Sequence, residues 1–202
     1  MLFEDTYRTI DQPTTGEFRD KGSKFLAYAF PIRTEEEVKN HLQALRAEHP
    51  KARHHCFAWR LGLGRDNYRV NDDGEPSGTA GRPILNTLYS QDLTNILVIV
   101  VRYFGGTLLG VPGLINAYKT ATVEALVNAV VVSKTINEIY RIEVGFERLN
   151  DVMKLIKEQQ LTVLQQSFNQ ECTLEIELRR TLVNVVIGRL EKMEGVQVTF
   201  VG

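Results

Sequence analysis

Runs of apolar residues separated by polar turns predict an alternation of strands and helices along the whole chain. The strongest signal is at residues 96–101, an unbroken run of β-branched residues and leucine. Such a short run between turn residues predicts a central strand that is buried on both faces of its sheet. Other strands are expected at residues 23–31, 54–61 and 68–70.

Helix signals lie between these strands. Thr34 followed by Glu37 fits a capping box, and the apolar face behind it predicts a helix that closes before Pro50. A short helix is expected at residues 83–88, and a long one from Gly110 to about residue 134.

Three stretches of the amino-terminal part carry weaker signals. Residues 3–9 could form a short edge strand. Residues 11–22 read as a polar connection, and residues 71–81 read as a loop because they combine acids, glycines and a proline.

The pattern changes after residue 136. Strands are expected at 140–144, 161–168, 172–178 and 196–201, with amphipathic helices at 149–156 and 182–190 and a hairpin turn at 169–171. This order, strand-helix-strand-strand-helix-strand, is that of the ferredoxin-like split unit. The sequence therefore predicts an α+β protein with two domains, residues 1–135 and 136–202.

Composition argues against a membrane-spanning protein and against a strongly basic nucleic-acid-binding protein. The 202 residues are 43% hydrophobic and 24% charged, with a formal net charge of −1. This is ordinary for a globular protein, and any contact with nucleic acid would have to be local. The two cysteines, Cys56 and Cys172, are expected to be reduced core residues of a cytoplasmic protein, and no apolar run is long enough to span a membrane.

The central strand leads into the most glycine-dense turn of the chain. It delivers Arg102 and Tyr103 to its end, and Gly105, Gly106 and Gly110 follow before the long helix. A guanidinium beside a helix amino end would favour a phosphate or carboxylate. The alternative is that the glycines permit tight packing and that Arg102 pairs with an internal carboxylate.

Catalytic and metal motifs are weak. His54 and His55 are adjacent on a strand and point to opposite faces, so they cannot share a metal ion. Ser77 lacks the glycine of a nucleophile elbow and is better suited to cap the following helix. The acids Asp72, Asp73 and Glu75 most simply order their loop and pair with Arg82 or Arg102. We assign no catalytic residue, metal or cofactor.

Basic residues are interleaved with aromatic residues near the strand at 23–31. A cluster of this kind suits single-stranded nucleic acid, and it is equally compatible with a solvated strand end whose aromatic rings lie in the core. Its members are Phe18, Arg19, Lys21, Lys24, Phe25 and Arg33.

Two stretches, DDGEPSGTAG at residues 72–81 and VVRYFGG at residues 100–106, resemble the YigZ/IMPACT family. Leu109 and Gly110, which follow the second stretch, belong to the same match, and lesser agreement is seen at residues 23–25, 55–56, 113–114 and 117–118. Pro112 and Asn116 depart from the family pattern, which commonly has glycine and arginine there, and Lys119 replaces part of the lost positive charge.

The resemblance covers both domains and implies their folds. The first would be an α/β sandwich similar to a ribosomal-protein domain, and the second a ferredoxin-like domain similar to the last domain of elongation factor G. It also implies a cytosolic protein without established enzymatic chemistry, whose eukaryotic relatives regulate translation initiation through a protein partner.

We therefore expect a binding protein of translation or its regulation, which contacts RNA, the ribosome or a translation-associated protein through a groove of the first domain. One alternative is a hydrolase or transferase that acts on a phosphorylated or peptidic substrate at the glycine-rich turn, with Glu75 or a histidine as base. Another is a pure protein-interaction module. The expected binding residues are Lys24, His54, His55, Asp73, Glu75, Ser77, Gly78, Arg102, Tyr103, Gly105, Gly106, Gly110 and Lys119.

Overall fold

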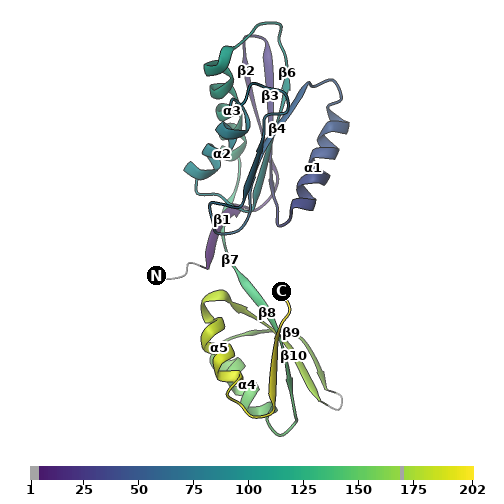
Figure 1. The fold of residues 1–202 in the computed structure, drawn as a ribbon, viewed down its shortest axis with the longest axis vertical. Coiled ribbons are helices and arrows are strands. Elements are labelled where there is room, and N and C mark those ends of the chain that lie inside the picture. Colours follow the sequence, from purple (N-terminus) through teal and green to yellow (C-terminus); the bar gives the residue numbers. More distant parts are fainter. Residues whose placement is uncertain (1–4, 169–170) are drawn as a thin grey trace. The chain divides into compact units, whose positions relative to one another are not determined.

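The computed structural model describes residues 5–168 and 171–202. The chain divides into two compact units, one formed by Tyr7–Lys134 and the other by Thr135–Gly202 together with Asp5 and Thr6. Each unit has its own sheet, helices and apolar core (Figure 1). The α+β fold class predicted from the sequence is confirmed.

The first unit is built on a five-stranded sheet in which neighbouring strands are antiparallel. Its central strand is fully buried from Ile96 to Arg102, as the unbroken apolar run predicts. In spatial order the strands are β2 (Thr14–Asp20), β3 (Ser23–Pro31), β6 (Ile96–Tyr103), β4 (His54–Arg60) and β5 (Tyr68–Asn71).

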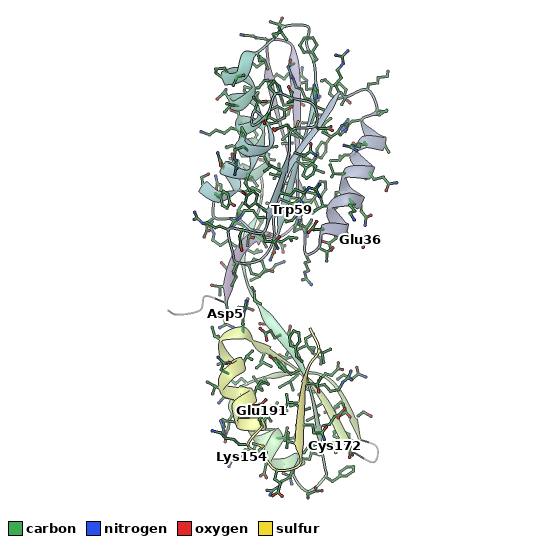
Figure 2. The ribbon with its side chains drawn as sticks, viewed as in Figure 1. Asp5, Glu36, Trp59, Lys154, Cys172 and Glu191 are labelled. Carbon is green, nitrogen blue, oxygen red and sulfur yellow. The ribbon has the colours of Figure 1, made fainter. Side chains whose placement is uncertain are left out.

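Helices cover both faces of this sheet (Figure 1). Helix α1 (Glu35–Glu48) lies on one face, and α2 (Gly81–Ser90) and α3 (Gly110–Val127) lie on the other. Successive side chains of β6 alternate between the two faces, so the unit has two apolar layers. Trp59 belongs to the layer under α1 (Figure 2).

The predicted capping box at the start of α1 is present. Thr34 Oγ1 accepts a hydrogen bond from the Glu37 backbone N–H at 3.3 Å, and Glu37 Oε2 accepts one from the Arg33 backbone N–H at 2.6 Å. These two bonds satisfy backbone donors that the helix itself leaves free.

Two predictions for the first unit are wrong. Much of the expected connection at 11–22 is strand β2, because Gly16 has no Cβ and lets β2 pack directly on the backbone of α3 at Ala125. The long helix ends at Val127, because the valine-rich segment after it forms β7 (Val131–Thr135), which pairs with β1 (Thr6–Ile10). The expected first strand began at residue 3, outside the described residues.

The second unit has the ferredoxin-like element order. The elements are β8 (Asn137–Val144), α4 (Leu149–Glu158), β9 (Thr162–Phe168), β10 (Cys172–Arg179), the short helix η1 (Arg180–Leu182), α5 (Val183–Leu190) and β11 (Val196–Phe200). The sheet order is β11-β8-β10-β9, and both helices pack on one face over a core that includes Cys172 (Figure 2). The turn predicted at 169–171 lies mostly outside the described residues.

Candidate functional site

Sheet register places the predicted binding residues that lie on strands at one end of the sheet of the first unit. Lys24 pairs with Tyr103, and His54 pairs with Arg102. The alternation of side chains divides these residues between the two faces: Lys24, His55 and Tyr103 lie on the α1 face, and His54 and Arg102 on the other. They share a sheet end but do not line one groove.

Glu75 is the centre of a buried polar network. Its Oε1 accepts a hydrogen bond from Arg102 Nη1 at 2.6 Å and another from the Tyr118 hydroxyl at 2.7 Å. The side chains of Glu75 and Arg102 are 4% and 6% exposed. The network therefore connects the loop after β5 to β6 and α3. Arg102 pairs with an internal carboxylate, which was the second of the two roles expected for it.

Cys56 extends this network to β4. Its thiol donates to the carbonyl oxygen of Asp72 at 3.0 Å, and its Sγ lies 3.3 Å from the Tyr118 hydroxyl oxygen. Burial raises the pKa of the Cys56 thiol and also the pKa of the Tyr118 phenol. Both groups therefore remain protonated donors at neutral pH, and Cys56 is not an activated nucleophile.

Asp72 organises the loop that carries Glu75. One carboxylate oxygen accepts from the backbone N–H groups of Ala80 and Gly81 at 3.0 and 2.8 Å, and the other accepts from Gly78 at 2.9 Å. Asp72 therefore satisfies free donors where α2 begins. The expectation that Ser77 caps this helix is wrong, because the cap residue is Ala80 and Ser77 is exposed.

Asp73 holds the same loop against β4. Its Oδ2 accepts from the His55 backbone N–H at 2.7 Å, and its backbone carbonyl lies 2.8 Å from Nδ1 of His54. A carbonyl oxygen can only accept, so Nδ1 of His54 carries the proton. Both histidines therefore help to position this loop, which has a positive φ of 41° at Asp73.

The glycine turn after β6 is shaped by one close approach. A Cβ at Gly105 would overlap the backbone of Gly22 in the turn between β2 and β3, and Gly105 N–H donates to Ser23 Oγ at 3.2 Å. Gly106 and Gly110 have positive φ values of 89° and 70°. These conformations favour glycine and present the loop before α3 at the surface.

Three polar side chains on the α1 face were not anticipated as partners of the predicted site. Tyr103 OH lies 2.9 Å from Nδ1 of His49, and Nε2 of that ring lies 2.7 Å from Tyr28 OH. Lys24 Nζ forms an ion pair with Glu17 at 3.1 Å. No local spacing signals the His49 contacts, because its partners are 21 and 54 residues away in the chain.

Gly78 and Lys119 belong to a different feature, a groove of about 430 Å³ between α2 and α3. We call it the α2–α3 groove. Helical spacing explains the set, because residues four apart share one helix face. It is lined by Gly78, Arg82, Pro83, Asn86, Thr87, Ser90, Ile115 and Lys119.

The described residues add neither a metal site nor a membrane-spanning helix to these features. Within residues 5–168 and 171–202, no three His, Cys, Asp or Glu side chains are grouped so that they could hold a metal ion. In the same residues, no helix is both long enough and apolar enough to cross a membrane.

Comparisons with known proteins agree with the resemblance seen in the sequence. Residues 21–126 match the Impact N-terminal domain. An IMPACT family member of Haemophilus influenzae is 33% identical over 178 residues, covering 87% of this chain and 86% of that protein. IMPACT family member YigZ of Escherichia coli is 37% identical over 146 residues, covering 71% and 72%.

A solved structure supports the same relationship over the full length. The crystal structure described as that of a hypothetical protein superposes with a TM-score of 0.73 and 29% sequence identity, and covers 99% of each chain. Together with the match to the Impact N-terminal domain, which spans more than half of the residues, these similarities show that the chain belongs to the IMPACT family.

Proposed function

We propose that this protein acts by binding, in translation or its regulation, and that its Tyr7–Lys134 unit contacts RNA, the ribosome or a translation-associated protein. The link to translation rests on the family resemblance. The preference for binding over catalysis rests on the geometry of the loop at residues 72–81.

Glu75 carries the argument against a general base. Its side chain is 4% exposed, and its Oε1 already accepts hydrogen bonds from Arg102 and Tyr118. A general base must reach a proton on the substrate and accept it. The arrangement of Glu75 supports a structural role, in which the acid shapes a surface for a partner.

Charge is divided unevenly along the chain, and this supports a polyanionic partner for the first unit. Tyr7–Lys134 contains 16 Lys and Arg and 13 Asp and Glu, a net charge of +3. The rest of the chain contains 8 Lys and Arg and 12 Asp and Glu, a net charge of −4. The net charge of the whole chain is therefore close to zero although its first unit is basic.

Basic and aromatic side chains meet at the sheet end that carries Lys24. The basic residues come from residues 19–24, where β2 turns into β3, and from residues 51–53, just before β4. Phe104 follows the end of β6, and 45% of its surface is exposed. Phosphate contacts combined with base stacking suit RNA. We call this the sheet-end surface: Arg19, Lys21, Lys24, Lys51, Arg53 and Phe104.

The test compares two triple variants with the same change of charge. Lys21→Glu, Lys51→Glu, Arg53→Glu alters exposed residues of the sheet-end surface, and Lys154→Glu, Lys157→Glu, Lys192→Glu alters exposed residues of the second unit. Binding of single-stranded and structured fluorescent RNA is measured by anisotropy at several salt concentrations, and ribosome binding by cosedimentation.

The intact protein should bind with an affinity that falls steeply as salt rises. In the sheet-end variant, loss of three phosphate contacts should make the negative slope of log Kobs against log salt shallower by about 2 for single-stranded RNA. The second-unit variant should retain binding. Failure of the intact protein to bind either RNA or ribosomes, or an equal loss in both variants, would contradict a polyanion-binding role for this surface.

A further inference from the structure

The surface of α3 next to the α2–α3 groove is unusually apolar. Leu108, Val111 and Ile115 are 83%, 51% and 39% exposed, although the other face of the helix is buried in the core. Val111 and Ile115 are four residues apart and therefore lie on one side of the helix, and Leu108 lies in the loop that leads into the helix. Exposed aliphatic side chains beside a groove are typical of a surface that another molecule covers, and we call these three residues the row.

Two cations lie at the same place. Arg82 on α2 and Lys119 on α3 both line the groove and both are exposed. Within the described residues neither forms an ion pair, and Arg82 lies over the Tyr68 ring at 5.8 Å. The groove therefore presents positive charge that no internal carboxylate neutralises.

We propose that the α2–α3 groove and the row Leu108, Val111 and Ile115 dock a short acidic amphipathic segment of a protein partner. Its apolar side chains cover the row, and its carboxylates approach Arg82 and Lys119. An amphipathic helix laid in a groove binds in this way, with anchors three and four residues apart.

The chemistry of the lining favours a peptide over RNA. Bases stack on aromatic rings, and none of the groove-lining residues is aromatic. Aliphatic side chains beside two cations instead match a segment that alternates apolar and acidic residues. The groove and its row share no residue with the sheet-end surface, so the inference goes beyond the RNA contact proposed above.

The experiment selects 16-residue peptides from a random phage-displayed library on the full-length protein. Anisotropy then measures the affinity of the enriched peptides for the protein and for three variants: Arg82→Glu with Lys119→Glu, Ile115→Asp alone, and Arg33→Glu with Lys39→Glu as the charge-matched control. The control residues are exposed on and before α1, on the other side of the sheet. Melting temperatures confirm that each variant is folded.

The enriched peptides should combine Asp or Glu with apolar residues at helical spacing. Their affinity should fall about tenfold or more in the groove charge variant and in Ile115→Asp, and stay unchanged in the control. The sheet-end triple variant should bind these peptides with unchanged affinity. The peptide result can therefore be judged independently of whether the sheet-end surface binds RNA.

Three outcomes would overturn the inference. The first is a set of peptides without acids, or one that binds all variants equally. The second is an RNA oligonucleotide whose binding is lost in the groove charge variant but kept in Ile115→Asp, which would assign the cations to RNA. The third is self-association of the protein that Ile115→Asp abolishes, measured by light scattering, which would assign the surface to a second copy.

Discussion

At the scale of single residues, the Glu75–Arg102 pair tests whether the buried polar network around Glu75 is structural. Glu75→Gln leaves the buried Arg102 guanidinium without its carboxylate, which sits 2.6 Å away. Removing one partner of a buried ion pair costs about 3–5 kcal/mol, because the other charge stays desolvated. Urea unfolding at neutral pH should show this loss, and Arg102→Met added to Glu75→Gln should recover part of it.

The same variant separates the structural role from the enzymatic alternative. A general base that is not needed for folding would leave the free energy of unfolding almost unchanged when replaced by Gln. A change below about 1 kcal/mol for Glu75→Gln would therefore count against the structural role.

Two histidines give the molecule a stability that depends on pH, and His55 is the one that is buried in the structure. Burial lowers its pKa from the ordinary value of 6.5, with a smaller opposing effect from Asp73. Below that value the unfolded chain binds a proton that the folded protein does not, so the free energy of unfolding falls as pH decreases from about 7 to about 5.5. His41 shows the same direction for the same cause.

The measurement is a series of urea unfolding curves across this pH range. His55→Gln removes the titrating group and should flatten the decline, although His41 leaves part of it. A variant with the same decline as the original protein would show that His55 does not control acid stability.

At the scale of elements, Gly105 fixes how β6 leaves the sheet. A Cβ at this position would overlap the backbone of Gly22, which cannot move without disturbing the turn between β2 and β3. Gly105→Ala should therefore lower the free energy of unfolding by about 1–3 kcal/mol or more.

Gly188 in α5 is the matched control. It has no neighbour within 4 Å of the added Cβ and lies inside a helix. Gly188→Ala should raise stability by about 0.5–1 kcal/mol, because alanine is the better helix former. If the two substitutions had equal effects in denaturant unfolding, close packing would not be the reason for glycine at position 105.

The elements also show which parts of the fold are visible in the sequence. The run at 96–101 and the capping box at Thr34 are local signals, and the structure confirms both. Strand β2 is polar and depends on pairing with β3 and on contact with α3, more than 100 residues away. Strand β7 depends on pairing with β1. Local patterns do not contain such partners.

The contacts of the candidate site also divide into those that the sequence indicates and those that depend on distant residues. Pairing of Glu75 with Arg102 was among the expected alternatives because a buried charge needs an opposite one. The third member, Tyr118, comes 43 residues after Glu75 and lies on α3, and nothing near Glu75 indicates it. Asp72 rather than Ser77 satisfies the backbone donors at the start of α2, because its carboxylate accepts from three N–H groups at once.

At the scale of the whole molecule, the two units have separate cores, and we expect each to unfold as its own cooperative transition. Leu85 and Leu174 are fully buried, one in each core. Leu→Ala at either position removes apolar contacts worth about 2–5 kcal/mol. Calorimetry of the full chain should therefore show two transitions, of which Leu85→Ala lowers one and Leu174→Ala lowers the other. If either substitution shifted both transitions together, or if a single transition remained, the units would be one cooperative body and the boundary near residue 135 would have no thermodynamic meaning.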